Sequence, residues 1–408
     1  MLLRIAILII LMLVLPDTYI YLMYIRRWTR RLSLRLLCFL PSLLLAIAAI
    51  AIMSSNDMKP EHQSWVGMYM MVFLVVCIPK TLFMVCDIIG HFLIWIIFQV
   101  LQAPRRFKHI FARIFRIIGM SLSIMAASVL CFGYFVGRHY YVVHQQSFYF
   151  PELPKEFDGY RIAQFSDMHI GTFRDGNEKD VRKIVDLINQ QQCNAILFTG
   201  DLVNHQSSEL DGFRRDLSLL KAPDGVFAVM GNHDYSLYIK YPNEKERAAD
   251  VEELQHRIRS YGWTLLLNEH RTIHRGKDSI VIAGVENDGR PPFPAYGDLK
   301  KAMRGVKNGT FTVLLSHDPT SWQRHVLPQT DIRLTLSGHT HAGQFKVFGW
   351  SPVAPIYDEW SGAYSNGTQI LNVSDGIGAV MFPFRFGAWP EVNVITLHRG
   401  MPQKIKGY

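Results

Sequence analysis

The chain has 408 residues, a net charge of +9 and a slightly positive mean hydropathy. This length exceeds one average domain and predicts two or three. Most of the basic excess lies between apolar stretches before residue 140, so membrane topology explains it better than nucleic-acid binding, and we expect no nucleic-acid partner.

The N-terminal third of the sequence is predicted to be a transmembrane helical region, residues 1–137, with about four spans. Each apolar stretch is near the roughly 20 residues that cross about 30 Å of hydrocarbon. The stretches are 2–25, 34–53, 65–86 and 117–136. A cleaved signal peptide is the alternative for the first stretch, because Arg4 precedes it. The stretch is too long for that, and no small-residue cleavage site follows it.

The third apolar stretch continues to Leu101 past Pro79, so one long kinked helix and two short helices both fit it. The flanking charges distinguish them, because cytoplasmic loops are rich in Lys and Arg. Segments 26–35 and 105–116 are strongly basic, whereas 54–64 carries Lys59 against Asp57 and Glu61. We therefore predict that both basic loops are cytoplasmic and that the chain crosses once between Ser64 and Pro104.

Two further features of the N-terminal half allow local predictions. Asp87 and His91 are four residues apart and would share a helix face. They fit an intramembrane proton or ion site, or an interfacial pair near the cytoplasmic end of a span, and we favour the interfacial pair. Residues 138–158, rich in Tyr, His, Gln and Pro, are predicted to be a linker.

The remaining residues, 159–408, alternate strand and helix, which predicts an α/β domain with its ligands at the carboxyl ends of strands. The expected strands of the first part are 161–166, 195–199 and 226–230, and its expected helices are 177–191, 209–220 and 244–260. Later strands are expected at 280–285, 311–315, 332–336, 369–373 and 392–397. The second half should therefore be rich in β-structure. Its one cysteine, Cys193, excludes a disulfide framework within this domain.

Five short polar motifs each follow an apolar run that is typical of a buried strand. They are Asp167-Met168-His169, Gly200-Asp201-Leu202-Val203-Asn204, Gly231-Asn232-His233-Asp234, Ser316-His317-Asp318 and Gly338-His339-Thr340-His341. Any one of them has an ordinary explanation as a helix cap or a turn. Together they supply the carboxylate, amide and imidazole ligands that two divalent ions need.

These motifs resemble those of the calcineurin-like metallophosphoesterase family, and particularly a membrane-tethered bacterial branch. The resemblance covers roughly Tyr160 to Leu397. It includes the closing stretch Ser374-Asp375-Gly376-Ile377-Gly378, with Pro383-Phe384-Arg385 and Pro390-Glu391. It implies a β-sandwich flanked by helices, and hydrolysis of a phosphomonoester, phosphodiester or pyrophosphate bond.

The resemblance also implies a ligand set for two divalent ions. Asp167, His169 and His341 would hold one ion, and Asn232, His317 and His339 the other. Asp201 would bridge them, since its carboxylate can bind both at once. Two ions about 3.5–4 Å apart would clamp a phosphoryl group and activate a hydroxide. These ligands accept Mn, Fe or Zn.

His233 is the candidate general acid, because the family places this histidine beside the phosphate. Asp234 or Asn204 could orient its ring. Many relatives carry Asp where this chain has Asn204, and a neutral amide holds a cationic imidazole less strongly. Asn287 and Asp288 are candidates to line the substrate pocket, although Asn-Asp-Gly is also a good turn. Arg385 is a candidate to grip phosphate oxygens.

The sequence therefore predicts a multi-pass, binuclear metal-dependent phosphoesterase of the bacterial inner membrane, with its catalytic domain on the extracytoplasmic side. The anchor suggests a lipid-linked envelope substrate, because tethering concentrates the site at the bilayer surface. A nucleotide-type diester is the chemical alternative. A metal- or phosphate-binding sensor without turnover is the alternative of another class, and the intact ligand set opposes it. A transporter with an accessory hydrolase would need internal repeats, and we find none.

Overall fold

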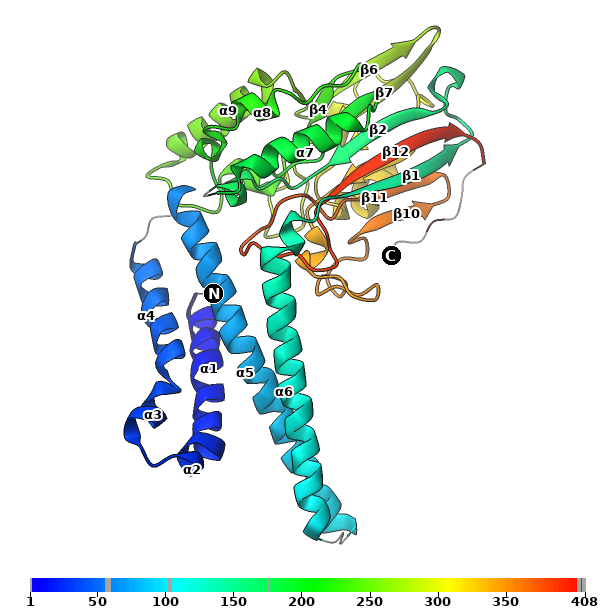
Figure 1. The fold of residues 1–408 in the computed structure, drawn as a ribbon. Helices are drawn as coiled ribbons and strands as arrows, with labels where there is room; N and C mark the ends of the chain where they lie inside the picture. Colours follow the sequence, from blue (N-terminus) through cyan, green and yellow to red (C-terminus); the bar gives the residue numbers. More distant parts are fainter. Residues whose placement is uncertain (1, 56–59, 102–104, 175, 402–404, 406–408) are drawn as a thin grey trace. The chain divides into compact units, whose positions relative to one another are not determined.

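The computed structural model describes residues 2–55, 60–101, 105–174, 176–401 and 405. The chain divides into two compact units (Figure 1). The helical unit holds Met1–Asp57 and Trp65–Phe135, and the sandwich unit holds Val136–Tyr408 together with Met58–Ser64.

The helical unit consists of apolar helices. They are α1 (Leu2–Ile20), which runs on through η1 (Tyr21–Ile25) and α2 (Arg26–Trp28), then α3 (Leu32–Leu37), α4 (Leu40–Ser55), α5 (Pro60–Leu101) and α6 (Arg105–Phe135). Three of them are long and apolar enough to cross a membrane, over Ile9–Trp28, Trp65–Ile97 and Phe107–His139. The remaining predicted span, 34–53, corresponds to α4, whose apolar part, Leu40–Ile52, is shorter.

Helix α5 settles which of the two alternatives holds for the third apolar stretch. It is one helix of 42 residues with Pro79 inside it, in agreement with a single crossing. Asp57, Lys59 and Pro104, on which the charge rule partly rested, lie outside the described residues.

The basic segment 105–116, predicted to be a loop, is instead the beginning of α6. The reason is its apolar spacing, since Phe107, Ile110, Phe111 and Ile114 recur at helical intervals. The positive charges of this segment therefore extend from a helix and not from a connecting loop.

Asp87 is buried inside the helical unit, and its place near the membrane interface stays a prediction. Its carboxylate accepts hydrogen bonds from the hydroxyls of Tyr19, at 2.6 Å, and Tyr24. His91 is about half exposed, and its Nδ1 lies 3.5 Å from Asp87 Oδ1. A carboxylate in a medium of low dielectric constant needs such partners, so Asp87 ties α1 and η1 to α5.

The sandwich unit is built on two six-stranded sheets (Figure 1). The first has the order β1 (Val142–Phe150), β12 (Glu391–Arg399), β2 (Tyr160–Phe165), β3 (Ala195–Phe198), β4 (Val226–Ala228), β5 (Thr264–Leu265). The second has the order β10 (Gly362–Asn366), β11 (Gln369–Val373), β9 (Leu334–Ser337), β8 (Thr312–Leu315), β7 (Asp278–Gly284), β6 (Glu269–Arg275).

Helices and single helical turns connect these strands. The helices are α7 (Glu178–Gln190), α8 (Arg214–Leu217), α9 (Glu244–Ser260), α10 (Leu299–Ala302) and α11 (Leu327–Gln329). The turns are η2 (Gly137–His139), η3 (Lys155–Phe157), η4 (Ile170–Phe173), η5 (Ser207–Leu210), η6 (Asn232–Tyr235), η7 (Trp322–Val326) and η8 (His341–Gln344).

The main core lies between the two sheets, where Leu197 and Phe227 of the first sheet belong to one buried cluster with Leu315 and Leu336 of the second. Helices cover the outer faces, and Figure 1 shows α7, α8 and α9 on one side of the first sheet. Helix α7 packs there because its apolar side chains, Val181, Ile184, Val185 and Ile188, recur at i, i+3, i+4 and i+7. The unit is therefore a β-sandwich flanked by helices, as the family resemblance implies.

The predicted helix 209–220 does not form as one element. Turn η5 ends at Leu210 and α8 begins at Arg214. Gly212 lies between them with a φ of 90°, a left-handed conformation that interrupts a right-handed helix. The apolar spacing alone did not reveal this break.

The predicted linker, 138–158, contributes a strand to the first sheet. Strand β1 pairs in parallel with β12, and Phe148, Phe150, Leu153 and Phe157 are buried in the main core. The polar residues of β1 lie mainly in its middle, whereas Phe148 and Phe150 at its end are buried. The sandwich unit thus begins near Val136 and not at residue 159.

Removing residues 136–158 should therefore destabilise the sandwich unit. Fully burying a large apolar side chain contributes about 1.5–3 kcal/mol, so the four lost from the core account for roughly 6–12 kcal/mol. That is comparable to the roughly 5–15 kcal/mol that stabilises a whole domain. A fragment 159–408 should aggregate or unfold at much lower urea concentration than 136–408. Equal urea midpoints for the two fragments would contradict this role of β1.

Candidate metal centre

The five polar motifs begin just after β2, β3, β4, β8 and β9. Strands β2, β3 and β4 run parallel to one another, and so do β8 and β9, so their carboxyl ends lie together within each sheet. Hydrogen bonds join the two edges here. The His339 N–H donates to the carboxylate of Asp167 at 3.0 and 3.1 Å, and His317 Nδ1 donates to the carbonyl of Thr199 at 2.8 Å.

The backbone at this edge is strained. Five non-glycine residues of the motifs have left-handed φ values between 43° and 75°, namely Asp167, His169, Asp201, His339 and His341. Such conformations cost about 1–3 kcal/mol each and tend to cluster at functional sites. They turn the ligand side chains inward directly after β2, β3 and β9.

Two motif glycines permit the close approach of these turns. A Cβ atom on Gly231 would lie 2.2 Å from Asp201 Oδ1, and one on Gly338 would lie 2.0 Å from Ser166 Oγ. Side chains at these positions would therefore force the motifs apart.

Asp167, His169 and His341 form one group of potential ligands, with one ligand atom from each lying within 4.8 Å of the others. His341 Nε2 is 3.3 Å from Asp167 Oδ1 and 3.1 Å from His169 Nε2. All three side chains are buried.

Asp201, His317 and His339 form a second such group. His317 Nε2 lies 3.1 Å from Asp201 Oδ2, and Asn232 Oδ1 lies 2.8 Å from His339 Nδ1. Asp201 also approaches the first group, since its Oδ2 is 3.7 Å from His169 Nε2. The structure thus brings together all seven predicted ligands, with Asp201 between the two groups.

Several buried polar atoms of this cluster have no hydrogen-bond partner among the described residues. They are His169 Nδ1, Asn204 Oδ1 and Asp318 Oδ2. An unsatisfied buried polar group costs about 1–3 kcal/mol, so the arrangement calls for further partners. Carboxylate, amide and imidazole donors suit divalent Mn, Fe or Zn, and the residues present therefore fit two such ions.

Opposite charges balance one another inside the cluster. Burial would raise the pKa of Asp201, but His317 and His233 beside it lower that pKa well below its ordinary value. Burial would likewise lower the pKa of His317, but the carboxylates of Asp201 and Asp167 raise it to about 10. The two carboxylates therefore favour the protonated imidazole of His317.

His233 lies at the rim of the cluster and is partly exposed. Its Nδ1 donates to the backbone carbonyl of Asn204 at 2.6 Å, and its backbone N–H donates to Asp201 Oδ1 at 2.8 Å. The ring of Tyr238 lies against it, with 4.3 Å between the ring centroids. Asn204 thus contacts the His233 ring through its backbone carbonyl. A chain with Asp at this position would have the same backbone carbonyl, so the presence of Asn here does not affect this contact.

Asp234, the other residue proposed to orient His233, makes no hydrogen bond to its ring in the described structure. Its carboxylate instead accepts from the backbone N–H groups of Gly231, Asp201, Leu202 and Val203, at 2.8–3.2 Å. The Asp234 carboxylate bonds to the backbone because four converging N–H donors in a buried turn need an acceptor. Asp234 therefore holds the Asp201 loop against the Asn232 loop.

Arg385 is fully buried and does not reach out to a substrate, contrary to its interpretation as a phosphate-gripping residue. Its guanidinium donates to the carbonyls of Gly378, at 2.5 and 2.9 Å, and Asp375, at 2.5 Å. Its Nη2 also lies 3.0 Å from His341 Nδ1. Arg385 therefore fixes the position of His341.

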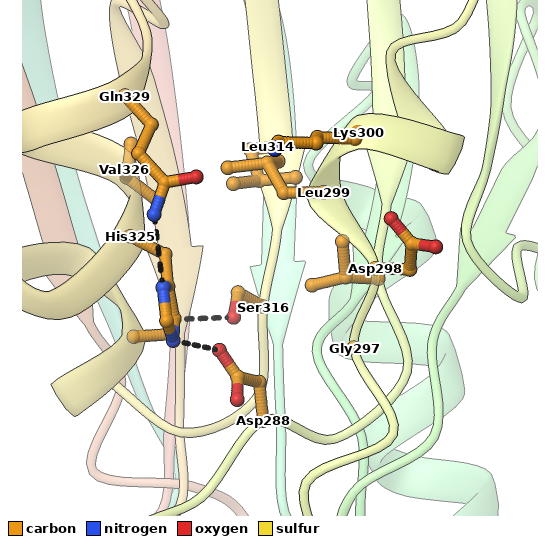
Figure 2. A pocket seen from close by; sticks show the side chains of 12 residues that line it. Asp288, Gly297, Asp298, Leu299, Lys300, Leu314, Ser316, His325, Val326 and Gln329 are labelled. Atoms are coloured by element: carbon orange, nitrogen blue, oxygen red, sulfur yellow. Dashed lines mark hydrogen bonds and ion pairs between the residues drawn. The ribbon is translucent and has the colours of Figure 1, made fainter.

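The proposed pocket role of Asn287 and Asp288 is not borne out at this cluster. Asn287 is buried and its side-chain amide donates to the carbonyl of Pro294 at 2.6 Å. Asp288 lines a different cavity of about 390 Å³, where its Oδ2 lies 3.3 Å from His325 Nε2 (Figure 2). None of the seven candidate ligands lines that cavity.

Three residues near the cluster were not singled out from the sequence. Asp318 Oδ2 lies 3.7 Å from His339 Nε2, and the hydroxyl of Tyr357 lies 3.0 Å from the same nitrogen. The hydroxyl of Tyr238 accepts from the Asn232 amide at 2.8 Å. Asp318 belongs to the fourth motif and could have been considered, whereas nothing local marks the two tyrosines.

Both parts of the chain match known protein families. Residues 160–343 match the family described as calcineurin-like phosphoesterase, and residues 3–138 match one described as probable calcineurin-like phosphoesterase, transmembrane domain. The N-terminal match and the apolar helices together identify a membrane protein.

Individual relatives support the same assignment. Uncharacterized metallophosphoesterase YkuE of Bacillus subtilis is 30% identical over 261 residues, which cover 60% of this chain and 81% of that protein. Transmembrane protein with metallophosphoesterase domain of Danio rerio is 31% identical over 255 residues, covering 60% of this chain and 55% of that protein. Among solved structures, that of TT1561 of Thermus thermophilus overlaps 54% of this chain and 90% of its own at 16% identity, with a low TM-score of 0.33.

Metal binding should strengthen as pH rises. An ion bound at His317 Nε2 has to displace the proton that the raised pKa, about 10, holds there at lower pH. Each displaced proton should make the apparent affinity for Mn²⁺ about tenfold tighter per pH unit. Calorimetric titration of the full chain at about pH 6 and about pH 8 measures this. A His317→Gln variant should bind more weakly with a shallower slope, and an unchanged affinity between the two pH values would refute the linkage.

Proposed function

Because the chain belongs to the calcineurin-like phosphoesterase family, we propose that it is a membrane-anchored, metal-dependent phosphoesterase with a binuclear centre. The convergence of Asp167, His169, Asp201, Asn232, His317, His339 and His341 at one edge of the sandwich carries this proposal. His233 beside them supplies a group that can exchange a proton.

Two divalent ions, when bound, would polarise the phosphoryl group and lower the pKa of an attacking water. Asp201 lies within reach of both ligand groups and is the proposed bridge. His233 is the proposed general acid. Its Nδ1–H is used in the bond to the Asn204 carbonyl, which leaves Nε2 to give a proton to the leaving oxygen.

Tyr238 and Tyr357 are proposed to position the substrate beside these groups. Tyr238 is about 40% exposed and lies against His233, and Tyr357 reaches His339 from another loop. Their hydroxyls are suited to bind phosphate oxygens or the leaving group, a part that Arg385 cannot take while it is buried.

The membrane anchor supports a proposal for the class of substrate. A phosphorylated lipid of the cell envelope is the proposed substrate, because a site tethered to a bilayer meets such molecules at a raised effective concentration. A nucleotide diester would gain nothing from the tether.

We further propose that the sandwich unit lies on the extracytoplasmic side of a bacterial inner membrane. The basic residues of 26–35 and 105–116 and the single helix α5 between the two segments support this orientation. A reporter active only outside the cytoplasm, fused after Tyr408, should be active. Activity of the opposite reporter, which works only in the cytoplasm, would reverse the orientation.

Substitutions should separate metal binding from proton transfer. Asp201→Asn should abolish both Mn²⁺ binding and turnover of a chromogenic phosphoester by the full chain in detergent. His233→Asn should keep the metal but lower kcat by about 10²–10⁴-fold, the usual contribution of general acid catalysis.

Asn204→Ala is the matched control, because the backbone carbonyl that contacts His233 remains. This variant should lower kcat by less than about tenfold. Metal binding by the wild type without turnover of any ester would refute the enzyme and favour the sensor. Assays with lipid pyrophosphates and with cyclic nucleotides decide the substrate class, and turnover of the nucleotides alone would exclude the envelope lipid.

A further inference from the structure

The helical unit contains a cavity of about 740 Å³ that is lined by cations. It lies where the end of η1 and α2, the second half of α5 and the first turns of α6 meet. Arg27, Lys108 and Arg116 line it together with His91 and His109. Among the residues that the structure describes, no carboxylate lines this cavity.

Two carboxylates, Asp17 and Asp87, lie within the part of the unit that the structure describes, and neither makes an ion pair there with Arg27, Lys108 or Arg116. Asp17 pairs with Lys80 at 2.6 Å. Asp87 accepts from Tyr19 and Tyr24 and lies 3.5 Å from His91 at the wall of the cavity. Three cations that share a cavity in a membrane-embedded bundle repel one another and favour the binding of an anion.

A mainly apolar cavity of about 800 Å³ adjoins the cationic one. The two share Tyr24 and Arg116 among their lining residues. Ile20, Phe83 and Ile117 line the second cavity between α1, α5 and α6, and Lys80 and Arg113 also reach its wall. The combined space therefore has a cationic end and an apolar extension along the helices.

Two tryptophans indicate the depth of the cationic end. Trp28 and Trp95 line it and are 76% and 59% exposed. Exposed tryptophans of membrane proteins concentrate at the head-group level of the bilayer. The cavity therefore lies at the depth of lipid head groups, with the apolar groove extending toward the hydrocarbon.

We propose that this cavity is a binding site for an anionic phospholipid. Arginine binds phosphate oxygens with two parallel hydrogen bonds, and basic pockets between membrane helices bind lipid head groups. The lipid phosphate lies among Arg27, Lys108 and Arg116, and an acyl chain fills the groove beside Ile117. A free phosphate would leave the groove without an apolar occupant, so the chemistry selects a lipid.

The test is lipid retention by the full-length protein in mixed micelles of phosphatidylglycerol and phosphatidylcholine, measured by native mass spectrometry. The wild type should retain phosphatidylglycerol with about tenfold preference. The triple variant Arg27→Gln, Lys108→Gln, Arg116→Gln should lose that preference. A wild type without preference would overturn the proposal.

A matched control removes the same charge outside the cavity. Arg26, Arg30 and Arg31 are exposed and do not line it, so replacing all three by Gln should leave the preference intact. An equal loss in both variants would indicate attraction by net charge alone and refute the site. Displacement of the lipid by excess inorganic phosphate would also refute it, since the anion would then suffice.

If the triple Gln variant fails to fold, the variant Arg27→Lys, Arg116→Lys keeps the charge and tests the cavity. It should still prefer phosphatidylglycerol, because the cations remain. Loss of the preference in this folded variant would contradict the proposed charge recognition. Size-exclusion chromatography and turnover of a chromogenic ester report folding, because none of these residues belongs to the candidate metal centre.

Discussion

Two carboxylates buried at the meeting edge of two sheets set the main constraint on this protein. Asp167 and Asp201 are almost completely excluded from water, where an uncompensated charge would be prohibitive. Imidazoles and a backbone N–H from the opposite sheet compensate them. The strained backbone of the motifs and the glycines that allow the turns to approach both serve this arrangement.

A set of buried polar groups outside the ligand set holds the ligands in place. Asp234 collects four N–H donors of the Asp201 and Asn232 loops, and Arg385 holds His341 while it bonds to the carbonyls of the closing stretch. Both residues looked like participants in the chemistry when only their motifs were known. Their burial assigns them to positioning, which is the usual requirement for precise metal geometry.

In the described part of the helical unit, too, buried carboxylates have partners, but a group of cations does not have a carboxylate beside it. Where carboxylates lie inside it, as at Asp17 and Asp87, cations or hydroxyls meet them. Where its cations gather around the cavity of Arg27, no carboxylate lines the space among the described residues. At the depth of the head groups, an anionic lipid of the bilayer is the proposed counterion.

Much of this protein was determined by its sequence alone, because the decisive signals were local. An apolar run predicted the strand Gln369–Val373, and a charged amphipathic pattern predicted the helix Glu244–Ser260, at the bounds that the structure has. The five polar motifs after other apolar runs supplied the candidate ligands, which the family resemblance assigned to two ions. The length and hydropathy of the N-terminal stretches were sufficient to indicate membrane helices.

Other features were decided only by the tertiary structure. The pairing of β1 with β12 joins segments that lie at opposite ends of the sandwich unit's sequence, and no local pattern specifies such a partner. The bond from His233 to a carbonyl, the approach of Tyr238 and Tyr357 and the burial of Arg385 likewise depend on distant loops. A sequence pattern encodes which faces are apolar, whereas three-dimensional packing decides which polar groups meet and which of them remain exposed to a substrate.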